Sequence, residues 1–379
     1  MATLDSPVQG HADPDFAAVA AAFAENFRSR DELGAAVCLY RAGVKVVDLW
    51  GGWADAARTR PWREDTIVCM MSVGKGMAAL CVWMLVDRGQ IDIDRPVADY
   101  WPGFAGGGKG GITVRTLLQA KAGLLYLDHA PDGSAYDWET IVAAIEAQEP
   151  CWEPGTDHGY HSATMGHLLG ELVRRVDGRM IDRFLREEVT GPLGADYGYG
   201  AAWADPARVA DIVPNAASHT FVQTRDPSTK LGRAWRIRPV VEDHYNDEMA
   251  RTRIFPSSNG HGNARSVARI FAALAEGGRL DGTTLMSAGT VDRMREQSWH
   301  GTCAMTDRTF RYAHGFFLNE PAMSPMGTNP RAFGHPGAGG AIGFADPENG
   351  IAFSYSPALM CAGGGVGDRC EALVAAAYA

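Results

Sequence analysis

Hydrophobic residues follow different patterns at the two ends of the chain and in its middle. Near the N-terminus, apolar segments at 35–40 and 44–50 flank a short Arg-Ala-Gly turn, an arrangement typical of a β-hairpin. Near the C-terminus, segments at 340–345 and 351–355 flank an Asp-Pro-Glu-Asn-Gly turn. The pattern therefore predicts one hairpin at each end of the chain.

The middle of the chain shows the three- and four-residue apolar spacing of helices. Helices are predicted near the termini at 14–27 and 369–378, and between them at 77–88, 113–120, 138–148, 164–176 and 179–188. Strands at both ends and helices between them favour an α/β (α+β) fold. In this fold one antiparallel sheet is built from both termini, is flanked by helices and carries an inserted, mostly helical lobe.

We expect a single unit over residues 1–379, with a cleft between two lobes. The α/β lobe would comprise 1–66 and 262–379, and the mostly helical lobe 67–261. Within the second lobe, residues 220–256 are rich in charge and proline and have no clear periodicity. They are predicted to form a long loop or a lid over the cleft.

Charge and composition exclude several classes of partner. The net charge of −10 argues against nucleic acid or an anionic membrane surface as the main partner. The first residues show no basic segment followed by an apolar one, and no apolar run is long enough to span a bilayer. A cytoplasmic location is therefore expected.

Cysteines, histidines and a glycine-rich segment give no sign of a metal or cofactor. The seven cysteines include no C-x-x-C pair and are expected to be buried, reduced thiols. The histidines at 158, 161, 167 and 261 lack acidic partners at ligand spacing, and they are interpreted as loop or cap residues. Residues 103–110 nearly match a phosphate-binding loop, but the final hydroxyl residue is missing, so a flexible surface turn is predicted.

Ser72 and Lys75 form the first candidate catalytic pair. Among five lysines, only Lys75 follows a serine by three positions, and it stands at the start of the apolar helix predicted at 77–88. Residues three apart lie on one helix face. Burial and the positive end of the helix dipole both favour a neutral amine, which can activate the serine hydroxyl as a nucleophile. The alternative is a helix-capping Ser72 and a surface Lys75.

Two further groups could complete this chemistry. Tyr160 lies in a loop before a buried helix, where a nearby lysine cation would lower its pKa and let it move protons. The alternative is a core tyrosine with a hydrogen-bonded hydroxyl. The N–H groups of Ser72 and Ala338 could hold an oxyanion, since the helix start leaves the first unpaired and glycines surround the second. A simple glycine-rich turn is the alternative for Ala338.

Three ordered motifs resemble those of the serine β-lactamase/penicillin-recognising superfamily. Ser72-Val73-Gly74-Lys75 matches S-x-x-K, Tyr160-His161-Ser162 matches the Y-x-N element, and His335-Pro336-Gly337 matches the K-T-G element. Segments at 92–97 and 112–118 also look familiar, so the resemblance spans nearly the whole chain. Within the superfamily, the chain is similar to class C β-lactamases and, more so, to family VIII serine carboxylesterases. The resemblance implies a β-lactamase/transpeptidase-like fold.

The departures from the lactamase motifs favour an esterase. His335 and Pro336 replace the lysine and the threonine that, in lactamases, help to bind the substrate carboxylate, and Ser162 replaces the asparagine. Short, uncharged acyl esters are therefore the expected small-molecule substrates, cleaved by hydrolysis or transesterification. Arg331 is close in sequence and could supply a cation, which leaves a class C-like β-lactamase or D,D-peptidase as the alternative. A non-catalytic, penicillin-binding-like sensor is a further alternative.

The resemblance assigns a role to each candidate residue. Ser72 would attack the ester, Lys75 and Tyr160 would transfer its proton, and the N–H groups of Ser72 and Ala338 would hold the oxyanion. No metal or cofactor is implied. The expected substrate contacts are Trp152, Ser162, His335 and Gly337.

Overall fold

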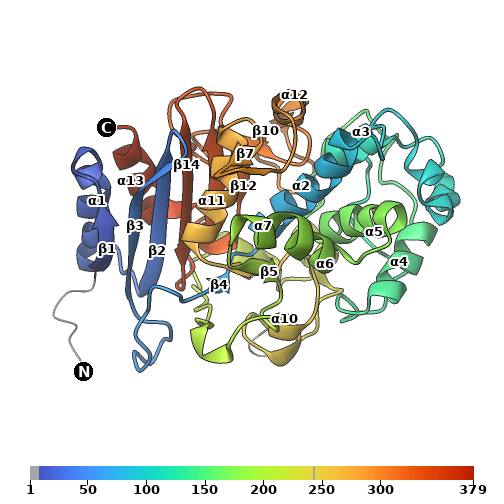
Figure 1. The fold of residues 1–379 in the computed structure, drawn as a ribbon. Coiled ribbons are helices and arrows are strands. Elements are labelled where there is room, and N and C mark those ends of the chain that lie inside the picture. The colour runs from blue at the N-terminus through green and yellow to red at the C-terminus, as the bar shows by residue number, and fades with distance from the viewer. Residues whose placement is uncertain (1–7, 242–243) are drawn as a thin grey trace.

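The computed structural model describes residues 8–241 and 244–379, and within this part the main feature is a nine-stranded antiparallel sheet. Its strands follow the order β1-β3-β2-β14-β13-β12-β11-β10-β9. Their bounds are Val8–Ala12 (β1), Gly34–Arg41 (β2), Val44–Gly52 (β3), Trp299–Thr302 (β9), Thr309–Tyr312 (β10), Phe317–Leu318 (β11), Phe333–Pro336 (β12), Ile342–Asp346 (β13) and Ile351–Pro357 (β14). The sheet is therefore built from both ends of the chain, as predicted (Figure 1).

Both predicted hairpins are confirmed. β2 and β3 are joined by a tight turn at Ala42 and Gly43, both of which have positive φ angles. β13 and β14 form the second hairpin. β14 then pairs with β2 from Ile351 opposite Arg41 to Pro357 opposite Ala35, and this pairing joins the two hairpins into one sheet.

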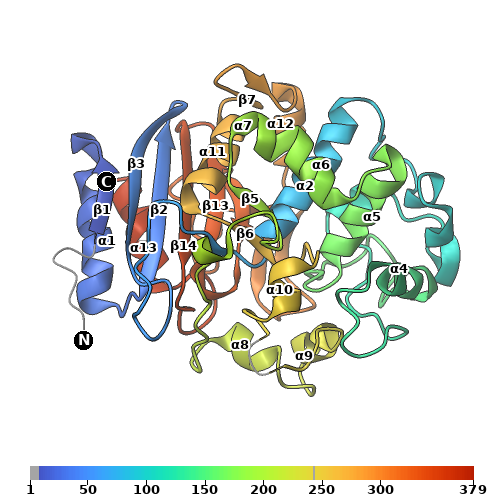
Figure 2. The same cartoon turned by 60° about the horizontal axis from the view of Figure 1, so that its bottom comes forward.

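Helices cover the sheet and close its core. α1 (Ala17–Ser29) and α13 (Gly367–Ala377) pack against each other beside the N-terminal strands, and α11 (Ala264–Ala275) packs on β2, β13 and β14. Figures 1 and 2 show these two groups of helices on opposite sides of the strands. β14 is buried along its whole length, as expected for a strand with both faces covered.

The inserted lobe contains the predicted helices. They are α2 (Val73–Asp87), α3 (Val114–Leu118), α4 (Trp138–Ala147), α5 (Met165–Asp177) and α6 (Ile181–Leu185), the last continued by a π-helical turn (Arg186–Thr190). Every residue of α2 from Val73 to Val86 is buried, which is typical of a helix that is apolar on all sides. α2 packs on α5, α6 and β12, so it lies between these helices and the large sheet (Figure 1).

Residues 220–256 are not the long irregular loop that the sequence predicted. They contain most of α8 (His219–Gln223), together with α9 (Lys230–Trp235) and α10 (Glu248–Thr252). The side chains of Ser218, Thr229 and Asp247 cap the starts of these helices. Residues 242–243 of this segment lie outside the described residues. Figure 2 shows α8 and α9 side by side at the bottom of the molecule.

A small sheet brings together three short segments that are far apart in the sequence. β6 (Gly260–Gly262) lies between β4 (Val68–Cys69) and β5 (Tyr197–Tyr199) and pairs with both in antiparallel fashion. β4 ends three residues before Ser72, so this sheet holds the chain where α2 begins.

The glycine-rich segment at 103–110 lies mostly on the surface, as predicted, but Phe104 and Lys109 are fully buried. Pro102–Gly108 contains two short 3₁₀ turns separated by a kink at Gly106 and Gly107. Lys109 Nζ donates to the carbonyl oxygens of Gly106, Glu146 (3.0 Å) and Gln148 (2.6 Å). Lys109 therefore satisfies carbonyl groups at the end of α4, where a cation is favourable.

The other minor predictions are corrected in part. All four histidines of the predicted group are fully or almost fully buried, and His167 lies inside α5 rather than in a loop or cap. Six cysteines are buried as free thiols, but Cys151 is exposed. Among the described residues, no cluster of three or more His, Cys, Asp or Glu side chains could hold a metal ion. In the same part of the chain, no helix has the length and apolar character needed to cross a membrane.

Candidate active site

Ser72 lies at the turn between β4 and α2. Met71, directly before it, has a φ angle of 51°, a left-handed conformation that costs energy for a residue with a side chain and is found most often at functional sites. Ser72 occupies the N-cap position, but its side chain makes no capping hydrogen bond. The capping alternative is therefore wrong, and the hydroxyl instead points to the Ser257 carbonyl oxygen, 3.4 Å away.

The Ser72 hydroxyl also contacts Lys75. Its Nζ lies 2.8 Å from Ser72 Oγ and 2.6 Å from the carbonyl oxygen of Ser257. The lysine is fully buried, which excludes the surface alternative. Burial lowers the pKa of Lys75 well below its usual value, so the neutral amine is favoured. A neutral amine beside a serine hydroxyl is a base in position to accept its proton.

Tyr160 faces the same pair. Its ring centroid lies 5.0 Å from Lys75 Nζ, and its ring packs edge-on against Phe310 and Phe317. The expectation that a lysine cation lowers the pKa of Tyr160 is wrong. Burial raises the pKa of Tyr160, and the neighbouring Ser72 side chain offsets only part of that rise. Tyr160 is therefore a neutral phenol, able to donate a proton and receive one in exchange.

The end of β12 lies against the segment that leads to Ser72. Gly337 is so close to Met70 that a Cβ atom would overlap its carbonyl oxygen, so only glycine fits. Ala338 follows at the start of a short 3₁₀ turn. In the described part of the chain, the N–H groups of Ser72 and Ala338 donate to no backbone oxygen. Both residues line one cavity, so both donors are available to an oxyanion.

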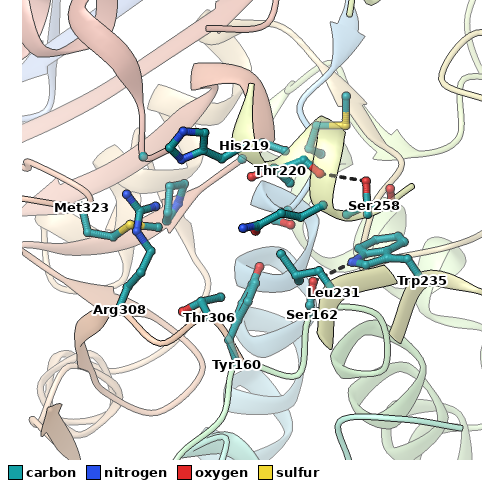
Figure 3. Close-up of a pocket in the computed structure, with 18 of the residues that line it drawn as sticks. Tyr160, Ser162, His219, Thr220, Leu231, Trp235, Ser258, Thr306, Arg308 and Met323 are labelled. Atoms are coloured by element: carbon teal, nitrogen blue, oxygen red, sulfur yellow. Dashed lines mark hydrogen bonds between the residues drawn. The ribbon is translucent and has the colours of Figure 1, made fainter. Parts of the chain in front are cut away.

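This cavity has a volume of about 310 Å³, the size of a small-molecule site. Besides Ser72, Tyr160 and Ala338, its walls include residues of α8, α9 and the segment after α9, of the loop between β9 and β10, and of β10 and β11. Among them are Thr220, Gln223, Leu231, Trp235, Arg238, Tyr245, Thr306, Arg308, Phe310 and Phe317. Figure 3 shows Tyr160 in the middle, with Leu231 and Trp235 on one side and Arg308 and Met323 on the other.

The four expected substrate contacts divide into two groups. Ser162 and Gly337 line the cavity, and Ser162 Oγ accepts a hydrogen bond of 2.8 Å from Trp235 Nε1. Trp152 does not line it. The Trp152 ring packs against Gly159, and its N–H donates to the Lys121 carbonyl at 3.2 Å.

His335 also lies outside the cavity lining, because its side chain points into the protein. It is fully buried, and its Nδ1 donates to the carbonyl oxygen of Pro336 at 2.8 Å. Burial and the nearby Lys75 lower the pKa of His335 to about 3, so the ring is neutral. Arg331, considered as a substitute cation, is exposed outside the cavity, with Nη1 3.4 Å from Glu348. Neither residue supplies positive charge to the site.

Three contributors to the site were not predicted from the sequence. The carbonyl oxygen of Ser257 carries no sequence signal, because any residue could provide it. Trp235 lies in α9, inside the segment that was interpreted as a lid. Arg308 lies in the loop between β9 and β10, and nothing in its sequence neighbourhood distinguishes it from other loop arginines.

Comparison with known proteins agrees with this geometry. The chain is 36% identical to Esterase/beta-lactamase LipL from Mycobacterium tuberculosis (strain ATCC 25618 / H37Rv) over 359 residues, 92% of this chain and 82% of LipL. A crystal structure of a family VIII carboxylesterase is 38% identical, with a TM-score of 0.88 and 98% of each chain covered. A penicillin-binding protein homolog from Caulobacter crescentus is 35% identical, with a TM-score of 0.87 and the same coverage. The Beta-lactamase family model matches residues 19–362, so the motif-based resemblance is confirmed and the chain belongs to that family.

Proposed function

We propose that the protein is a serine carboxylesterase in which Ser72 is the nucleophile and Lys75 its base. The observation that carries this proposal is the 2.8 Å contact between Ser72 Oγ and a fully buried Lys75 amine. A serine hydroxyl needs an adjacent base to attack a carbonyl, and a desolvated amine can act as one near neutral pH. The family VIII carboxylesterase and LipL support an ester as the substrate.

The reaction would proceed through an acyl-enzyme. Lys75 accepts the proton of Ser72 as Oγ attacks the ester carbonyl, and the N–H groups of Ser72 and Ala338 stabilise the oxyanion. Tyr160 gives its proton to the leaving alcohol and recovers one from Lys75. A water molecule, or a second alcohol in transesterification, then attacks the acyl group by the reverse sequence of proton transfers.

The cavity favours short, uncharged acyl groups. Leu231, Trp235 and Phe310 provide apolar walls, and the volume of about 310 Å³ leaves room for a small substrate. At the β12 edge, the neutral and buried His335 gives a carboxylate no cation. A small-molecule ester is the expected partner, and no cofactor enters the proposed reaction.

A β-lactamase activity is the second candidate, favoured by the similarity to a relative named Esterase/beta-lactamase. A fluorophosphonate probe and a series of p-nitrophenyl esters of increasing acyl length test the first proposal. We expect labelling at Ser72, loss of labelling in Ser72→Ala, and the highest kcat/KM for short acyl chains. Absence of both labelling and hydrolysis in the native protein would instead indicate a non-catalytic sensor.

A further inference from the structure

Among the described residues that line the active-site cavity, positive charge occurs without negative charge. Arg238 and Arg308 both belong to this lining, and no aspartate or glutamate of the described residues does. This is unusual in a chain with a net charge of −10, where most arginines pair with carboxylates on the surface. Among the described residues, neither of these two guanidinium groups takes part in an ion pair.

Arg308 is kept free by its surroundings. The nearest acid in sequence, Asp307, pairs with Lys230 at 2.6 Å, and Lys230 also donates to the Ala304 carbonyl at 3.0 Å. The guanidinium of Arg308 packs so closely on Gly364 that a side chain there would overlap it. Arg308 therefore packs on backbone and lines the cavity, and its guanidinium donates to no other described residue. Arg238 is instead held by stacking, 4.5 Å from the Trp235 ring centroid and 5.5 Å from that of Tyr245.

The loop that carries Arg308 is joined to the Tyr160 segment. The N–H of Tyr160 donates to Cys303 Sγ at 3.2 Å, and the N–H of Ala304 donates to the His158 carbonyl at 2.9 Å. Figure 3 shows Arg308 across Tyr160 from Leu231 and Trp235. Tyr160 is the proposed proton donor to the leaving alcohol, so Arg308 borders the space that this alcohol occupies.

We propose that Arg308 binds an anionic group, such as a carboxylate, carried by the alcohol portion of the ester substrate. This inference rests on the proposed esterase function and adds its substrate class: an uncharged acyl group joined to an anionic alcohol. A guanidinium binds a carboxylate through two parallel hydrogen bonds, and such charge-assisted bonds are stronger than neutral ones, most of all in a partly dry cavity. An apolar end and a cationic end would thus fix the orientation of the ester.

Two acetyl esters with closely matched leaving groups test the proposal: 4-acetoxybenzoate, which is anionic, and its neutral methyl ester. The measured quantity is the ratio of their kcat/KM values, compared between variants so that intrinsic reactivity cancels. Arg308→Gln is expected to lower the anionic-to-neutral ratio by about 10- to 100-fold, the usual effect of losing a charged hydrogen bond. Arg308→Lys should retain part of the preference for the anionic ester. Arg331→Gln, which removes an arginine outside the cavity, should leave the ratio unchanged.

The outcomes separate this inference from the proposed function. An unchanged ratio in Arg308→Gln, with the neutral ester still cleaved, overturns the anion site and leaves the esterase standing. A second pair, p-nitrophenyl hemiglutarate and p-nitrophenyl butyrate, places the anion on the acyl side. If Arg308→Gln lowers the anionic-to-neutral ratio for this pair but not for the first, the assignment of the anion to the alcohol is overturned. If the native protein cleaves no ester, the proposed function fails. Binding of 4-hydroxybenzoate, followed by tryptophan fluorescence in the native protein and Arg308→Gln, then tests the anion site alone.

Discussion

Lys75 Nζ lies 2.8 Å from Ser72 Oγ, and the lysine is fully buried, so water does not compete for this contact. We expect Lys75→Ala to remove nearly all ester hydrolysis at neutral pH, because groups that act as one unit lose most of their effect when either is removed. Acyl-enzyme formation, followed by mass spectrometry after mixing with a p-nitrophenyl ester, measures this loss.

The chain offers a matched control for this variant. Lys109 is the other fully buried lysine, and its amine donates only to backbone carbonyls far from the cavity lining. Lys109→Met should lower the unfolding temperature, since it leaves those carbonyls unpaired, but it should not change kcat of the folded enzyme. Equal losses of activity in both lysine variants would mean that Lys75 is structural.

The lowered pKa of Lys75 also predicts how stability depends on pH. A lysine in the unfolded chain titrates near about 10.4, so between the folded pKa and that value the unfolded state binds one more proton than the native state. The free energy of unfolding therefore increases with pH in this window. Lys75→Met removes the dependence. The difference in free energy of unfolding, variant minus native protein, should therefore increase as pH falls from about 10 to about 7. Denaturant unfolding at each pH measures this difference.

Activity should depend on the same group and in the same direction. Only the neutral Lys75 can accept a proton, so kcat/KM should fall on the acid side as this amine becomes protonated, and should be level above its pKa. His335 should contribute nothing near neutrality, since its pKa is held at about 3. His335→Gln should keep the acid limb of the profile unchanged. A limb that vanishes in this variant would assign the ionisation to the histidine instead.

Tyr160→Phe tests the proton path to the leaving alcohol. Loss of a general acid–base group typically lowers kcat by about 100- to 10,000-fold, and only a hydroxyl is removed, so the unfolding temperature should change little. Tyr126→Phe removes a hydroxyl outside the cavity lining and should leave kcat unchanged. Full activity in a stable Tyr160→Phe protein would remove this tyrosine from the mechanism.

The elements predicted correctly from the sequence are those whose signal is local. The hairpins joined at Ala42 and at Gly350 combine apolar segments with turn residues, and α2 combines a long apolar run with the motif at Ser72. α8, α9 and α10 have five or six residues each, too few for a hydrophobic period to show, and their capping side chains were the only signal.

The direction in which a side chain points was harder to predict than the place of its residue near the site. His335 was placed correctly beside the site in sequence, but successive residues of a strand point to opposite faces, and on β12 this side chain points inward while the next residue, Pro336, lines the cavity. The same holds for Lys109, whose burial depends on carbonyls contributed by α4. Such outcomes depend on contacts between distant segments, which one sequence does not specify.

A buried ion pair near the termini predicts a stability defect without a catalytic one. Arg369 Nη1 on α13 lies 2.9 Å from Glu32 Oε1 before β2, and Tyr355 donates to the other oxygen of Glu32. Removing one partner of a buried pair leaves a buried charge and typically costs about 3–5 kcal/mol. Arg369→Met should show this loss in denaturant unfolding with kcat unchanged. The double variant with Glu32→Gln should recover part of it, and failure to do so would show that packing, not charge, sets the cost.

The choice between esterase and lactamase depends on charge at the β12 edge. His335 is neutral and Pro336 has no hydroxyl, so neither residue compensates the desolvation of a β-lactam carboxylate at this edge. We therefore expect kcat/KM for p-nitrophenyl butyrate to exceed that for nitrocefin.

Changing His335 to lysine should not convert the enzyme into a lactamase. The side chain at this position points into the protein beside Lys75, so His335→Lys would bury a second amine next to the first rather than present a cation to the cavity. A lower unfolding temperature and no gain in nitrocefin hydrolysis are expected, because two neighbouring buried amines both lose hydration. A stable His335→Lys protein that hydrolyses nitrocefin faster than the native one would show that this side chain can reach the substrate, which would contradict its inward direction.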